Sequence, residues 1–197
     1  EGEKGLTIGQ LFGRKIFWIL MLMMICAGAS EQAMSQWASA FAESALSVSK
    51  TVGDLAGPCA FALCMGTARA LYGKYSDYIP LKKMMMGSAV LCIICYLIAV
   101  FAKNPVFGLI GCALCGFSVG IFWPGTFSIA ASAIPGGGTA MYALMALAGD
   151  LGCSSGPTVV GMIANASGDN LKSGLLIAMI FPVVMLLGIG MIREKKE

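Results

Sequence analysis

The stretch MMMGSAVLCIICYLIAVF, residues 84–101, decides the fold because it contains no charged side chain. A helix needs about 20 mostly apolar residues to cross the hydrocarbon layer of a bilayer, and this stretch is of that length. Five similar stretches lie on either side of it: Ile16–Phe41, Val52–Tyr72, Val106–Ile129, Thr139–Ala164 and Leu175–Ile192. They are continuous and about twice as long as a barrel strand. The sequence therefore predicts an all-α membrane protein with six transmembrane helices.

The composition agrees with this class and argues against an enzyme. Hydrophobic residues make up 58% of the chain and charged residues 12%, against about 25% charged residues in a soluble domain. The chain has no histidine, so it lacks the commonest general base and the commonest metal ligand. Residues 116–120 match G-x-S-x-G, but that motif needs a strand, a turn and a histidine. We expect no catalytic residue, no cofactor, no metal and no nucleic-acid partner.

The eight cysteines all lie in apolar stretches, where a thiol behaves as a small hydrophobic group. The pairs Cys92/Cys95 and Cys112/Cys115 have the C-x-x-C spacing of metal or redox sites. A thiolate–metal cluster is costly in hydrocarbon, so we interpret both pairs as packing residues.

The charges predict how the chain is oriented. Six spans place both termini on one side, and basic residues are enriched on the cytoplasmic side of membrane proteins. Ten basic residues fall on the side of the termini, and only Lys50, Lys103 and Lys172 on the other. We expect a multi-pass protein of the cell membrane with a cytoplasmic segment 1–15, a transmembrane domain 16–192 and a cytoplasmic tail 193–197. The chain begins with Glu1, and we expect a processed chain or a fragment of a longer one.

The first predicted helix carries a polar stripe. Its members recur at helical spacing, so they share one face: Glu31, Gln32, Ser35, Gln36, Ser39 and Glu43. Such a face avoids lipid, and it lines either a water-filled cavity or a polar seam between helices. Glu43 can also be a solvated helix end.

Two other predicted helices carry polar residues at mid-membrane depth. In the fifth, Asp150 is followed by Ser154 and Thr158 at four-residue steps; the acid can bind a proton, a cation or a substrate hydroxyl, or it can be tied to neighbouring hydroxyls for packing. In the fourth, Trp123 and Pro124 precede Thr126. Pro124 leaves a backbone carbonyl without its donor, and Trp123 offers a flat face for a sugar ring or only packs a kink.

Small residues and a short repeat predict how the helices are arranged. Gly116/Gly120 and Gly152/Gly156 have the small-xxx-small spacing that lets helices approach closely. Gly53-Asp54-Leu55 with Gly57-Pro58 in the second helix is echoed by Gly149-Asp150-Leu151 with Gly156-Pro157 in the fifth. Helices two and five are equivalent in a three-plus-three inverted repeat, and such a repeat is half of a twelve-helix transporter.

The loop between the second and third helices resembles the G-x-x-x-D-R-x-G-R-R/K loop of the major facilitator superfamily. Gly73, Asp77 and Lys82 match it, whereas Tyr78, Pro80 and Leu81 depart from it. Residues 120–130, GIFWPGTFSIA, resemble helix ten of fucose-permease-like sugar transporters.

The resemblance implies that the six helices are helices seven to twelve of a major facilitator fold. The amino-terminal half is then a separate chain or part of the same polypeptide, or a second copy takes its place. The substrate would lie near the midplane against Glu31, Gln32, Ser35, Gln36, Trp123, Thr126 and Ser154. Asp77, with Gly73, Arg69 and Lys82, would form a cytoplasmic gate.

We therefore expect half of a secondary transporter that moves a small polar solute, such as a sugar, by alternating access. Proton symport would use Asp150 or Glu31, because burial favours the neutral form of a carboxyl. Two alternatives stay open. One is a transporter of another organic solute or drug with different ion coupling. The other is a non-transporting membrane scaffold or self-assembling half-transporter.

Overall fold

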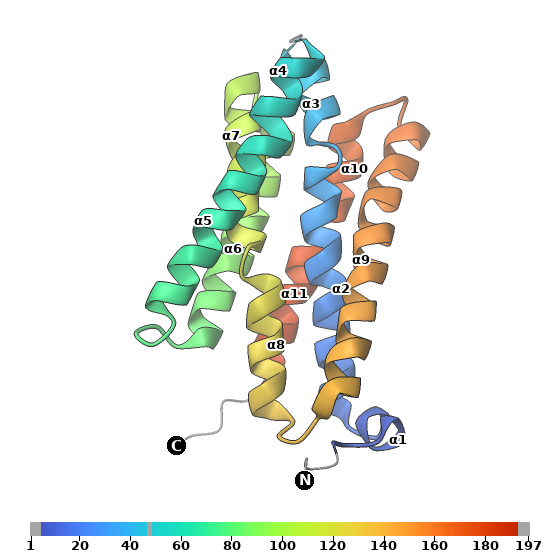
Figure 1. Ribbon diagram of the computed structural model, residues 1–197. Helices are drawn as coiled ribbons and strands as arrows, with labels where there is room; N and C mark the ends of the chain where they lie inside the picture. The colour runs from blue at the N-terminus through green and yellow to red at the C-terminus, as the bar shows by residue number, and fades with distance from the viewer. Residues whose placement is uncertain (1–4, 47–48, 193–197) are drawn as a thin grey trace.

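A computed structural model describes residues 5–46 and 49–192 as a bundle of long helices (Figure 1). A short helix, α1 (Ile8–Phe12), comes first, and its amino end is closed by a capping box between Thr7 and Gln10. Six membrane spans follow, in the order that the sequence predicts. They consist of α2 and α3 (Lys15–Ser35, Ala38–Leu46); α4, the π-helical η1 and α5 (Lys50–Asp54, Leu55–Cys59, Ala60–Tyr75); α6 (Leu81–Phe101); α7 and α8 (Pro105–Val119, Phe122–Ala133); α9 (Gly138–Ala166); and α10 and α11 (Leu171–Ala178, Ile180–Met191).

The predicted spans are confirmed, but several are interrupted rather than continuous. The first span breaks at Gln36 and Trp37, the fourth at Gly120 and Ile121, and the sixth at Met179. The second span contains the π-helical turn at Pro58, which has no N–H to continue the α-helical ladder. Hydropathy alone predicted none of these breaks.

Four stretches within the described residues are long and apolar enough to cross a membrane: Lys15–Glu43, Leu81–Phe101, Val106–Ala133 and Leu171–Met191. The fifth span, with 29 residues, is long enough. Asp150, Ser154 and Pro157 lower its hydropathy. The second and fifth spans are therefore the less apolar ones, as expected of helices that face protein or water instead of lipid.

Hydrogen bonds between loops show which ends of the spans lie together. Leu6 N–H donates to Gly136 O, and Lys82 Nζ donates to Ile192 O, so both ends of the described chain share one end of the bundle with these two loops. At the opposite end, Lys172 Nζ donates to Ala102 O at 3.4 Å. The start of the first span and the end of the sixth span therefore lie at the same end of the bundle, as the even number of spans predicts.

The spans pair in a pattern with internal symmetry. The first packs along the fifth, and the fourth along the second; the first also contacts the sixth, and the fourth the third. Exchanging spans one to three with spans four to six maps each of these four contacts onto another. The bundle therefore has the three-plus-three arrangement that the sequence predicts.

Glycines make the closest of these contacts. A Cβ on Gly152 would collide with the carbonyl oxygen of Ile25, and one on Gly156 with the backbone of Ala29. In the equivalent seam, a Cβ on Gly116 would collide with the carbonyl oxygen of Phe61. Figure 1 shows α2 and α9 side by side along their lengths. The small-xxx-small interpretation is confirmed in both seams.

Candidate functional site

The polar stripe of the first span lies at the junction of α2 and α3. Ser35 Oγ donates to Gln32 Oε1 at 3.4 Å, and Gln36 Nε2 donates to the same oxygen at 3.3 Å. Gln36 is exposed, and Gln32 and Ser35 are half-buried. These side chains hydrogen-bond along their own helix, so their outer surface stays free to meet water or a solute.

Glu31 lies beside this stripe, and one of its carboxyl oxygens is unusual. Oε2 is shielded from solvent and has no hydrogen-bond partner in the described structure. The positive charge of Arg69 of α5 is near enough to act on the Glu31 carboxyl, and the Glu31 carboxyl is near the Cys153 thiol of α9. A buried carboxyl oxygen without a donor is costly, so this atom is suited to hold a proton, a cation or a substrate hydroxyl.

The fifth span contributes a second set of polar groups. Ser154 Oγ donates to the backbone oxygen of Asp150 at 3.1 Å, and Thr158 Oγ1 donates to that of Ser154 at 2.7 Å, so the three share a face as predicted. Asp150 is exposed on this chain. Its carboxyl accepts no hydrogen bond from a described residue, so no hydroxyl or backbone group of the described chain holds it. The charge of Asp150 also acts on Cys153.

We refer to these residues together as the polar face. It comprises Glu31, Gln32, Ser35 and Gln36 of the first span and Asp150, Ser154 and Thr158 of the fifth. The two spans that carry these groups pack closely through Gly152 and Gly156.

The fourth span places only one of its two predicted site residues near this seam. Trp123 is half-buried, and its ring lies against Gly149 of α9. Thr126 is 0% exposed, and its hydroxyl donates to the carbonyl of Phe122 at 2.6 Å. Thr126 is therefore a packing residue of the bundle interior, and its assignment to the cavity is withdrawn.

The residues predicted to form a gate are not gathered in one place. Gly73 and Asp77 are exposed at the end of α5 and in the turn that follows. Lys82 Nζ donates to the Ile192 carbonyl at 2.5 Å, which ties the third span to the end of the sixth. Arg69 Nε donates to the carbonyl of Gly120 at 3.1 Å, at the bend of the fourth span. Lys82 and Arg69 thus have structural partners away from Asp77.

Two contacts gave no sequence signal. Trp37 Nε1 donates to the Pro157 carbonyl at 3.1 Å, so the break in the first span is held by the fifth. Ser39 Oγ contacts Asp54 Oδ1 at 2.5 Å and Glu43 Oε1 at 3.3 Å, which joins two acids from the first and second spans. Trp37 and Pro157 are 120 residues apart in sequence and Ser39 and Asp54 are 15 apart, so no local pattern predicts either pairing.

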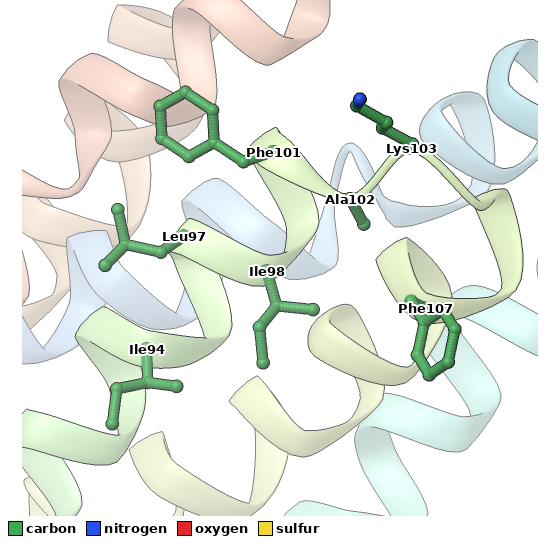
Figure 2. A pocket seen from close by; sticks show the side chains of 7 residues that line it. All are labelled: Ile94, Leu97, Ile98, Phe101, Ala102, Lys103 and Phe107. Atoms are coloured by element: carbon green, nitrogen blue, oxygen red, sulfur yellow. The ribbon is translucent and has the colours of Figure 1, made fainter.

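An open apolar cavity lies elsewhere on the bundle. It is an open groove of about 550 Å³ beside the loop that joins α6 to α7, and Figure 2 shows its lining: Ile94, Leu97, Ile98, Phe101, Ala102, Lys103 and Phe107. Apart from Lys103 these side chains are apolar. A groove of this composition suits lipid tails, and it contains none of the polar face.

The cysteines pack as expected of small hydrophobic groups. Cys92, Cys95, Cys112 and Cys115 are buried, and the closest thiol contact joins Cys92 to Cys115 at 3.9 Å. This contact runs between α6 and α7, across the two C-x-x-C pairs rather than within either. Among the described residues, no group of three or more His, Cys, Asp or Glu side chains could hold a metal ion.

Comparison with known proteins identifies the family. The family model of the Major Facilitator Superfamily matches residues 2–157, which is most of the chain. The chain belongs to the Major Facilitator Superfamily. The family is one of transporters and not of enzymes. No individually curated protein matches the chain.

A solved structure extends the similarity over the whole bundle. It is described as a "Crystal structure of a Major Facilitator Superfamily (MFS) transporter, FucP, in the outward conformation", and it superposes with a TM-score of 0.84 at 17% sequence identity. The match covers 93% of this chain and 45% of that one. The chain therefore has the fold of half a superfamily transporter, and it spans less than half the length of this match.

Proposed function

We propose that this chain forms the carboxyl-terminal half, helices seven to twelve, of a secondary transporter that moves a small polar solute by alternating access. The observation that carries this proposal is the polar face of the first and fifth spans, in which one carboxyl oxygen of Glu31 has no hydrogen-bond partner and Asp150 is exposed on this chain. Charged groups in a span are costly in lipid and are retained where they face a cavity or a partner. A water-filled path along this seam accounts for both carboxyls.

A sugar is the proposed substrate class. The half-buried ring of Trp123 beside Gly149 offers a flat surface for a sugar ring, and the amide and hydroxyl groups of Gln32 and Ser35 offer donors and acceptors for sugar hydroxyls. The resemblance of residues 120–130 to helix ten of fucose-permease-like transporters favours the same class. Trp123, Gln32, Gln36, Ser35, Ser154 and Glu31 are the proposed contacts.

Proton symport is the proposed coupling, with Asp150 or Glu31 as the carrier. Neither carboxyl is neutralised by a salt bridge to a described residue, so each can gain and lose a proton as the cavity changes sides. The proposed location is the cell membrane, with both termini in the cytoplasm and an amino-terminal six-helix half, or a second copy, completing the cavity. The segment 193–197 and residues 1–4, which carry part of the basic charge behind this orientation, lie outside the described residues.

The test is solute uptake by cells that express the full gene product, with external pH recorded while single sugars are added. Alkalinisation with one sugar, lost in Asp150→Asn or Glu31→Gln, supports symport. The matched controls are Asp169→Asn, at an exposed turn with φ 60° that asparagine tolerates, and Glu43→Gln. A wild-type protein that folds but takes up no sugar contradicts the sugar proposal, and it favours another organic solute or a non-transporting scaffold.

A further inference from the structure

A proline follows the bend of the fourth span: the break lies at Gly120 and Ile121, and Pro124 is in the first turn of α8. In a continuous helix the N–H of residue 124 would donate to the carbonyl of Gly120, four residues earlier. Pro124 has no N–H, so that carbonyl loses its helical donor. Arg69 Nε, from α5 of the second span, lies 3.1 Å from the Gly120 oxygen and donates to it instead. A charged donor makes a stronger hydrogen bond than a neutral one.

A second contact from α5 lies beyond the bend. Tyr72 is three residues after Arg69, so the two share one face of α5. The Tyr72 hydroxyl lies 3.5 Å from Ser128 Oγ, which itself donates to the Pro124 carbonyl at 2.9 Å. The second span therefore contacts the fourth span on both sides of its bend. Arg69 donates to the end of α7, and Tyr72 contacts α8.

The bend lies next to empty space. A cavity of about 140 Å³ between α5, α6 and the fourth span is lined by Tyr72, Phe117 and Ile121, among others. Ile121 is the residue at the bend itself. Close-packed interiors resist movement, so a cavity at this position leaves room for α7 and α8 to change their angle.

Two groups attract the Arg69 side chain: the Gly120 carbonyl and the Glu31 carboxyl. Its guanidinium makes no salt bridge with a described residue, yet Glu31 of the first span is near enough to interact with its charge. The hydrogen bond to Gly120 holds the guanidinium at the bend. A change in the charge of Glu31, such as that caused by the arrival of a proton or a solute, therefore alters the electrostatic attraction on the Arg69 guanidinium.

We propose that Arg69 is a positioning residue that fixes the bend of the fourth span through the Gly120 carbonyl and so sets the balance between the two open states of the cavity. This rests on the proposed function, because it assigns a role within alternating access. The angle between α7 and α8 also places Trp123, the second residue of α8, whose ring lies against Gly149. Weakening the Arg69 contact thus changes both the cavity opening and the ring that we propose binds solute.

A double-mutant cycle tests this. Pro124→Ala restores the missing N–H, so the Gly120 carbonyl no longer depends on Arg69. The readout is the rate at which a membrane-impermeant thiol reagent labels a single cysteine at Ser154, in the full gene product with its native cysteines replaced. Arg69→Gln should change that rate about tenfold, as expected for loss of a charged hydrogen bond. In the Pro124→Ala background the same substitution should change it less than about twofold.

Lys74→Gln is the matched control, because Lys74 is a basic residue of the same helix whose ammonium lies over the Tyr75 ring, 5.3 Å from its centroid. It should leave the labelling rate unchanged. The proposal is overturned if Arg69→Gln has no effect, or if its effect is as large in Pro124→Ala. If Arg69→Gln does not accumulate in the membrane, Pro124→Ala must restore accumulation, and failure to do so also overturns it. Cysteine labelling does not require transport. If the wild-type protein takes up no solute, the proposed function is contradicted, but the effect of Arg69→Gln on the labelling rate can still be measured.

Discussion

The breaks in the first and fourth spans occupy equivalent places in the two inverted triplets, but they are held in opposite ways. At the first, Trp37 of the broken span donates to the Pro157 carbonyl of the fifth span at 3.1 Å. At the fourth, the carbonyl belongs to the broken span, and Arg69 of the second span donates to it at 3.1 Å. The two triplets therefore have the same arrangement of helices, but the hydrogen bonds at their two breaks differ. One break is held by a neutral indole and the other by a charge that can respond to Glu31.

The two seams also differ in polarity. The first and fifth spans carry the polar face, with two carboxyls. The seam between the second and fourth spans has Arg69 and otherwise packs through residues such as Phe61, Met65 and Ala68. We infer that the two seams have different roles: the first and fifth spans supply most of the proposed solute contacts, and the second and fourth spans control the shape of the bundle.

The largest effect is expected where both seams depend on glycine. Gly152→Ala and Gly116→Ala each place a methyl group against a backbone oxygen, which cannot move as a side chain can. We expect each to lower the free energy of unfolding by about 3 kcal/mol or to prevent folding. Thermal unfolding in detergent checks this. Gly87→Ala, which has nothing within 4 Å, is the control and should be neutral or slightly stabilising. Equal stability of all three variants would contradict the close packing.

A smaller effect is expected at the first break. Trp37→Phe keeps a ring beside Gly161 and removes the hydrogen bond to Pro157, so we expect a loss of about 1 kcal/mol in unfolding free energy. Trp18→Phe serves as the control, because Trp18 Nε1 also donates to a carbonyl, that of Phe12 at 2.9 Å, but at an exposed position. The comparison between the two breaks fails if Trp18→Phe is the more destabilising variant.

Thr126 and Ser154 should differ in their effect on uptake. Thr126→Val removes a hydroxyl that is buried and bonded to its own helix, so the KM for the transported solute should stay within about twofold and stability should fall by about 1 kcal/mol at most. Ser154→Ala removes a hydroxyl from the polar face and should raise the KM. If Thr126→Val raised the KM and Ser154→Ala did not, Thr126 and not Ser154 would line the cavity.

The smallest effect is expected at Lys82. Lys82→Gln loses the contact with the Ile192 carbonyl at the end of the sixth span, where a positive charge favours the helix terminus. We expect about 0.3–1 kcal/mol of destabilisation and little change in uptake. A loss of transport with unchanged stability would instead support the gate role that the loop resemblance predicted.

Much of the fold could be predicted because hydropathy and span length are local properties. The six spans, the shared side of the termini and the glycine contacts all follow from residues close in sequence. The freed carbonyl at Pro124 was predictable as well, but its partner was not, because Arg69 is 51 residues away from Gly120 in sequence. The break at Gln36–Trp37 contains neither glycine nor proline, and it depends on the fifth span.

The candidate site was less predictable for a specific reason. A polar residue in a span was interpreted as facing water, yet a threonine can satisfy its hydroxyl on the carbonyl four residues earlier. Thr126 does this in the bundle interior, whereas Ser154 and Thr158 do the same on an exposed face. The sequence pattern is the same in both places, and only the packing of neighbouring helices distinguishes them.

The proposed cavity is tested most directly by asking whether the polar face is in contact with water. Single cysteines at Ser35, Ser154 and Ile94, in a full gene product without native cysteines, would be exposed in intact membranes to a membrane-impermeant thiol reagent. Ile94 lines the apolar groove of Figure 2 and serves as the lipid-facing control. If the polar face lines a water-filled cavity, the cysteines at 35 and 154 react and the cysteine at 94 does not. If the cysteines at 35 and 154 stay as unreactive as that at 94, the polar face is a sealed seam and the proposed cavity is wrong.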